Sequence, residues 1–188
     1  TIQTVQIDEQ CEDVLREVGN IGGGHAITTL SQMLGDTIEM CVPVCQVVEK
    51  NSLGTLFNDT ISLYAGVSME FQGNLECMIV LLLKNEFTSF ILKQVADEDV
   101  ADVSHMTDMQ KSAVCEIGNI ICNSYVTALA SLMDMSLNIS VPTMTVNTGE
   151  QILKKFISQY KENEDKLLFV TTTFYCHEQE LDSHILLH

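Results

Sequence analysis

The chain has 188 residues and a formal net charge of −17, with 26 Asp and Glu residues against nine Lys and Arg residues. Nucleic acids and anionic membrane surfaces are bound through basic residues, so this composition argues against both as partners. No apolar run approaches the roughly 20 residues of a membrane span, and the N-terminus has no signal-like apolar core, so we expect a cytoplasmic protein without membrane insertion. The seven cysteines include no CxxC pair, which favours reduced thiols over a zinc site.

The first half of the chain is predicted to begin with a long helix. Asp8 is its N-cap, and Gly35 stops it after residue 34. A short strand follows at residues 38–42, and Pro43 ends this strand or marks a sheet edge. A hairpin and a second helix complete this half, at residues 60–71 with 75–83 and at residues 86–95.

The second half repeats this order of elements. Thr107 and Gln110 form a capping box at the start of a helix that runs to about residue 133. A short strand at residues 137–141 ends at Pro142. A short amphipathic helix within residues 152–164 and a hairpin complete the half, the hairpin at residues 167–176 and 181–187.

The two halves align when the first is shifted by 99 residues, which is the separation of the two prolines. The shift superimposes identical residues: Glu17 on Glu116, Gly19 on Gly118, Asn20 on Asn119, Ile21 on Ile120, Thr28 on Thr127 and Leu30 on Leu129. Such a register indicates internal duplication. The hairpins align only when Leu75 is matched with Leu181, so the second copy should carry about seven additional residues before its hairpin.

The predicted fold is α/β, with an antiparallel-rich sheet and the two long helices packed side by side on it. We expect a single domain over residues 1–188, built from two pseudo-two-fold repeats at about residues 8–96 and 107–188.

Polar residues recur on one face of each long helix. At about 100° per residue, with Asp13 at 0°, Glu17 falls at about 40° and Asn20 at about 340°. The apolar residues Val14, Leu15, Val18 and Ile21 fall at roughly 80° to 200°, which is the expected core face. The second helix repeats the pattern with a polar face of Ser112, Glu116 and Asn119. Solvated Glu and Asn are common, and duplication copies residues passively, so spacing alone leaves a plain surface and a functional site both open.

The segments at residues 17–22 and 116–121 resemble the signature helices of the CheC, CheX and FliY phosphatase family. The family pattern is Asp or Ser, three residues, Glu, two residues, Asn, 22 residues and Pro. The chain contains it twice, as Asp13, Glu17, Asn20 and Pro43 and as Ser112, Glu116, Asn119 and Pro142. The resemblance covers nearly the whole chain, and the two complete motifs make it most similar to the CheC type.

The resemblance implies an enzyme that hydrolyses the aspartyl-phosphate of a chemotaxis response regulator, a CheY-type receiver. In the family, Asn positions the attacking water and Glu docks a lysine of the receiver, which implies catalytic roles for Glu17, Asn20, Glu116 and Asn119. Asp13, Pro43, Ser112 and Pro142 would shape the sites. The residues offer no nucleophile–base pair and too few ligands for a metal, so no metal or cofactor of its own is expected, and Mg2+ would come with the phosphorylated receiver.

Three other functions stay open at this point. The chain could chiefly bind the receptor deamidase CheD and have only weak phosphatase activity. It could serve a receiver outside chemotaxis, or it could be an acidic α/β domain without activity.

One segment departs from the family pattern, the run Gly22-Gly23-Gly24-His25. Glycine in a helix costs roughly 1 kcal/mol relative to alanine, so we expect these glycines to allow a close backbone approach to a neighbour. His25 falls at about 120° on the wheel, which predicts a packed or hydrogen-bonded histidine on the inner side.

Overall fold

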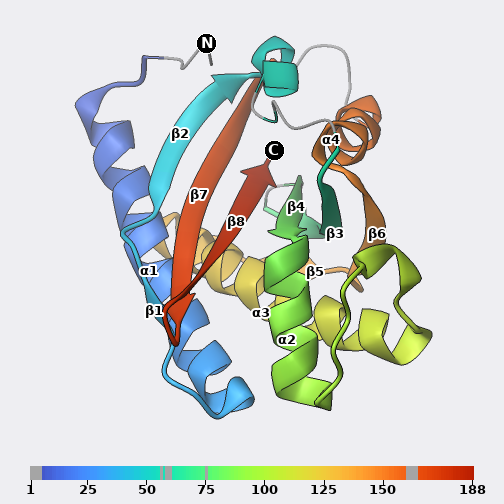
Figure 1. The fold of residues 1–188 in the computed structure, drawn as a ribbon. Helices are drawn as coiled ribbons and strands as arrows, with labels where there is room; N and C mark the ends of the chain where they lie inside the picture. Colours follow the sequence, from blue (N-terminus) through green and yellow to red (C-terminus); the bar gives the residue numbers. More distant parts are fainter. Residues whose placement is uncertain (1–5, 56, 58–60, 75, 160–164) are drawn as a thin grey trace.

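One antiparallel eight-stranded sheet runs through both halves of the chain in the computed structural model, which describes residues 6–55, 57, 61–74, 76–159 and 165–188. Its strands are β1 (Glu39–Met40), β2 (Val44–Glu49), β3 (Leu63–Gly73), β4 (Cys77–Lys84), β5 (Leu137–Ile139), β6 (Thr143–Thr148), β7 (Lys166–Cys176) and β8 (Gln179–Leu187). The order is β1-β7-β8-β4-β3-β5, with β2 also on β7 and β6 also on β3. Read outward from the central β4–β8 pair, each side of the sheet contains the hairpin of one repeat and then the two short strands of the other. This antiparallel sheet with its packed helices confirms the predicted α/β fold (Figure 1).

The two short strands after the prolines, β2 and β6, were not predicted. Pro43 lies between β1 and β2, and both of these strands pair with β7. Pro142 likewise lies between β5 and β6, which both pair with β3. Proline has no N–H for the ladder, so each proline interrupts one edge strand and does not end it. The predicted strands at residues 38–42 and 137–141 are correspondingly shorter.

The pairing register corrects the predicted insertion. Val44 of β2 pairs with Thr171, while its counterpart Thr143 of β6 pairs with Ser68. The hairpins are therefore offset by 103 residues at Ser68 and Thr171, four more than the helices. The predicted insertion of about seven residues before the second hairpin was therefore wrong, since the register gives four. The first copy has a 3-10 turn, η1 (Lys50–Thr55), where the second has α4 (Gly149–Ser158).

The predicted helix caps are confirmed. In α1 (Glu9–Leu34), the Asp8 side chain accepts the Cys11 N–H at 2.7 Å, and the left-handed Gly35 follows the helix. In α3 (Asp108–Leu132), both bonds of the Thr107–Gln110 capping box are present. The predicted helix at residues 86–95 is α2 (Asn85–Ala96), and a shorter 3-10 turn, η2 (Val103–His105), precedes α3. Parts of the remaining predictions fall on residues outside the described ranges: Thr60, Leu75, Tyr160 and Glu164.

Apolar residues alternate along the strands and form two cores. Ile79, Leu81 and Leu83 of β4 belong to the core beneath α1, α2 and α3, whereas Val80 and Leu82 face the core beneath η1 and α4. In α4 the buried residues are Ile152, Leu153 and Phe156, as its amphipathic pattern predicted, together with Gly149. The helices therefore divide between the two faces of the sheet (Figure 1).

Close contact between α1 and α3 depends on glycine, as expected. A Cβ added at Gly22 would lie 2.8 Å from the Cα of Tyr125, whereas one added at Gly24 would meet nothing within 4 Å. The helices run antiparallel, because the start of α1 and the end of α3, at Val14 and Leu129, line one cavity of about 480 Å³. The long helices thus pack side by side with their backbones in close contact at Gly22 and Tyr125.

We expect Gly22→Ala and Gly24→Ala to change stability in opposite directions. Alanine at residue 22 would force the two helices apart, which should lower the free energy of unfolding by about 1–3 kcal/mol. Alanine at residue 24 keeps open space around it and should raise that free energy by about 0.5–1 kcal/mol through helix propensity. Urea denaturation of both variants measures this difference, and equal effects would contradict the packing argument.

The wheel placed the buried face of α1 incorrectly. Val18 is buried as predicted, but Val14 is 44% exposed and His25 is also exposed. The residues buried in the second half of α1 are Gly22, Gly23, Ala26, Leu30 and Leu34. Contact with α3 through the glycines turns the buried face of α1 away from His25. The prediction that His25 lies on the inner side of the helix was therefore wrong.

Among the described helices, α3 has the length and composition of a possible membrane span, and 44% of that stretch is buried inside the protein. It packs against α1 and the sheet, which explains its apolar character without a membrane.

Candidate functional site

Site one comprises Asp13, Glu17, Asn20 and Pro43. The three helical residues are exposed on α1, as the wheel predicted, while Pro43 is buried. A Cβ added at Gly19 would lie 3.3 Å from the Pro43 ring and 3.0 Å from Cys45 Sγ. The absence of a side chain at Gly19 therefore lets the β1–β2 connection lie against the helix directly beside Asn20.

Site two comprises Ser112, Glu116, Asn119 and Pro142. Ser112 and Glu116 are exposed, whereas Asn119 and Pro142 are half-buried. Here the added Cβ of Gly118 would meet Val67 of β3 at 2.6 Å. The same sequence motif thus places its glycine against the sheet and leaves its proline less buried than in site one.

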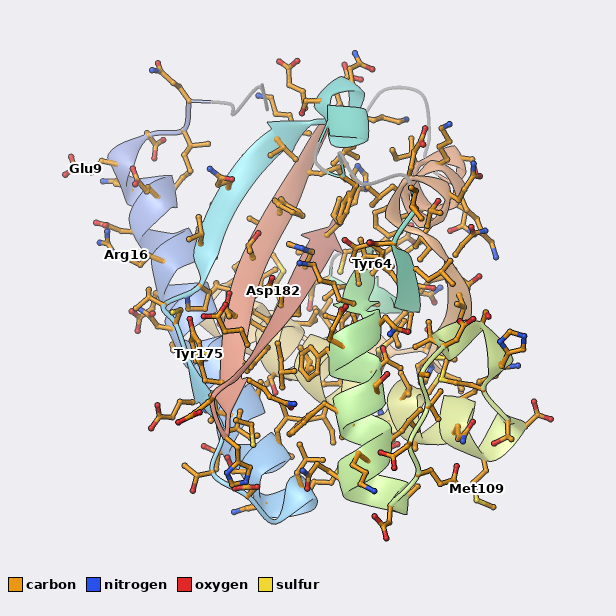
Figure 2. All side chains as sticks on the ribbon, viewed as in Figure 1. Glu9, Arg16, Tyr64, Met109, Tyr175 and Asp182 are labelled. Carbon is orange, nitrogen blue, oxygen red and sulfur yellow. The ribbon has the colours of Figure 1, made fainter. Side chains whose placement is uncertain are left out.

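The glutamates are available for a partner. Within the described residues, neither Glu17 nor Glu116 forms an ion pair or a side-chain hydrogen bond. Asp13, in contrast, is paired with Arg16, one turn along α1. Figure 2 shows Arg16 projecting from the outer side of that helix. Each site therefore presents one carboxylate without a fixed partner beside one carboxamide.

Sequence reasoning missed two side-chain neighbours of these motifs. One is Arg16, whose i to i+3 spacing from Asp13 could have revealed the ion pair. The other is Asn123, which donates from Nδ2 to Asn119 Oδ1 at 2.7 Å. Its i to i+4 spacing was visible, but its counterpart in the first copy is Gly24, so the repeat comparison did not select it.

Neither site offers a strong nucleophile. Cys45 lies beside site one, but burial raises the pKa of its thiol to about 11. Cys115 precedes Glu116, and burial also raises its pKa. A thiol becomes a good nucleophile only when its pKa is lowered, so these cysteines do not suit covalent catalysis.

The sites do not coincide with a potential metal cluster. Among the described residues, the group with metal-ligand character is Asp36, Cys176 and His177, at the turn between β7 and β8. His177 is hydrogen-bonded to Asp36, which follows the far end of α1. That end lies about 20 Å along the helix from Asn20, so this cluster is separate from site one.

Comparison with known proteins finds a family match over the two segments that carry the motifs. The model of the CheC-like family matches residues 12–45 and 109–146, which contain both copies of the motif. The chain is 30% identical over 186 residues to the CheY-P phosphatase CheC of Bacillus subtilis, covering 96% of this chain and 88% of that protein. It is also 21% identical over 149 residues to the putative CheY-P phosphatase CheC1 of Halobacterium salinarum, covering 79% and 75%.

Solved structures share the fold. FliY from Thermotoga maritima superimposes with a TM-score of 0.73 at 23% identity, covering 97% of this chain and 91% of that chain. The structure of a CheX–CheY complex with BeF3 and Mg2+ from Borrelia burgdorferi matches with a TM-score of 0.55 at 19% identity, covering 89% and 94%.

Proposed function

The chain belongs to the CheC-like family, and from this membership we propose that it is a cytoplasmic phosphatase of an aspartyl-phosphate on a CheY-type response regulator. The observation that carries the proposal is the repeated pair of Glu17 with Asn20 and Glu116 with Asn119. Each pair lies one turn apart on a long helix, with Glu17, Asn20 and Glu116 exposed and Asn119 half-buried. The Bacillus subtilis relative bears the name of a CheY-P phosphatase.

The reaction needs orientation more than a nucleophile. An aspartyl-phosphate is an activated acyl phosphate, so a water held in line with the bond to the carboxylate can attack phosphorus directly. The P–O bond to the aspartyl group breaks, the receiver carboxylate leaves, and inorganic phosphate is released. Asn20 and Asn119 would each hold this water through a carboxamide, which can donate and accept hydrogen bonds.

Docking is assigned to the glutamates. Glu17 and Glu116 would pair with a lysine of the receiver, and Asp13, Ser112, Pro43 and Pro142 would shape the surface around them. Mg2+ would enter as part of the phosphorylated receiver. The fold relative that was crystallised with CheY, BeF3 and Mg2+ supports a receiver as the partner. The net charge of −17 gives no long-range attraction to an acidic receiver, so we expect recognition by local contacts.

The direct test is the decay of a phosphorylated chemotaxis receiver. Adding the chain should accelerate release of inorganic phosphate catalytically, at a chain concentration far below that of the receiver. The same preparation should be tested for binding of CheD. Binding of CheD without any acceleration of receiver decay would contradict the proposal and favour a purely regulatory role.

A further inference from the structure

The two sites differ one helical turn after the water-positioning asparagine. In site two, Asn123 donates from Nδ2 to Asn119 Oδ1 at 2.7 Å. Its counterpart in site one, 99 residues earlier, is Gly24, around which an added Cβ would meet nothing within 4 Å. The Asn20 side chain makes no hydrogen bond to any residue that the structure describes. One site thus has a braced carboxamide and the other a free one.

Asn123 occupies its position at a cost to the fold. Its Oδ1 is buried and finds no hydrogen-bond partner within the described part of the chain. Buried acceptors without a donor destabilise a protein, and asparagine is a poor residue for a helix interior. Its amino group makes a hydrogen bond with Asn119, in the middle of the motif. The arrangement is therefore better explained by what it does to Asn119 than by stability.

The bond fixes the orientation of the Asn119 carboxamide. The terminal torsion of asparagine is broad and roughly two-fold, so an unbraced carboxamide exchanges its oxygen and nitrogen readily. The bond from Asn123 uses one lone pair of Oδ1 and leaves the second lone pair and both amino hydrogens of Asn119 for water and the phosphoryl group. The ordering of this side chain is then completed during folding instead of during catalysis.

We propose that Asn123 is a positioning residue that preorganises Asn119, so that site two carries the larger share of turnover. This inference rests on the proposed function. It predicts that Asn119→Ala loses more activity than Asn20→Ala, although the two motifs have identical Glu and Asn residues. Ordering one side chain in advance should be worth about threefold to tenfold in rate.

The first experiment isolates site two by Asn20→Ala. In that background, Asn123→Ala and Asn123→Asp should each lower kcat by about threefold to tenfold, with little change in the KM for the phosphorylated receiver. Aspartate has nearly the shape of asparagine, but its carboxylate cannot donate to Asn119 Oδ1. Loss of the brace therefore predicts equal defects, whereas a defect of packing would spare the aspartate variant.

The second experiment transfers the brace to site one. In an Asn119→Ala background, Gly24→Asn should raise kcat by about threefold to tenfold, while the matched Gly24→Ala leaves kcat unchanged. Both variants replace glycine in open space of α1, and alanine is the better helix former of the two, so a gain of rate through helix stability would be at least as large in the alanine variant. A gain of rate in the asparagine variant alone cannot result from misfolding.

The inference is overturned by an unchanged kcat in either experiment, or by Asn20→Ala losing more activity than Asn119→Ala. Failure of the proposed function has another signature, namely full activity in the protein that lacks both Asn20 and Asn119. Thermal unfolding of each variant, followed by circular dichroism, separates loss of rate from loss of fold.

Discussion

Replacing both Asn20 and Asn119 by alanine should lower the rate of receiver dephosphorylation at least about a hundredfold, because a misplaced attacking water alone can cost that much. The fold should survive. Asn20 is exposed and Asn119 is half-buried, and alanine is the better helix former at both positions. Phosphate release from the phosphorylated receiver, followed under saturating conditions, measures the loss. Each single variant should retain part of the activity, since the other site is intact.

A matched control distinguishes the asparagines of the motif from other carboxamides. Gln32 is exposed on α1, about 18 Å along the helix from Asn20, so Gln32→Ala should keep the full rate. If the double variant dephosphorylates the receiver as fast as the unmodified chain, the attacking water is not held by these residues and the mechanism is wrong.

The repeat was the feature of the sequence that predicted most. A single shift of 99 residues identified the two long helices, both prolines and both motifs, and in the structure each proline lies between two short strands that pair with the same hairpin strand. Helix ends were predictable because the caps at Asp8, Gly35 and Thr107 are local chemistry. The roles of the motif residues stay predictions, because they depend on a partner.

The sequence predictions failed where tertiary contacts determine the structure. The strands β2 and β6 are half-exposed edge segments with weak alternation, and they form only because β7 and β3 offer a free edge. The wheel angle predicted a packed or hydrogen-bonded His25 on the inner side, but the close contact at Gly22 rotates the buried face of α1. The brace at Asn123 lay outside the repeated positions. A comparison of the two repeats finds only residues that both contain, so it did not select Asn123, whose counterpart is Gly24.

Glu17→Gln combined with Glu116→Gln should raise the KM for the phosphorylated receiver about tenfold or more, while kcat falls much less. Removing one partner of a charge pair that becomes desolvated at an interface costs about 2–5 kcal/mol, and glutamine retains a hydrogen-bonding group that recovers part of it. Initial rates over a range of receiver concentrations separate the two constants. The opposite pattern, an unchanged KM with a large fall in kcat, would place the carboxylates in the chemical step and contradict their docking role.

The control for this prediction must keep the change of net charge and leave every residue of both sites intact. Glu12→Gln with Asp108→Asn removes the same two charges from the same two helices, at their exposed first turns. The chain has a net charge of −17, so these two carboxylates give no long-range attraction to an acidic receiver. The control should therefore leave the KM for the receiver unchanged, or lower it slightly by reducing the repulsion between the two proteins. A rise in KM that is confined to the Glu17 and Glu116 variant therefore reports a local contact, since both variants alter the overall field by the same amount.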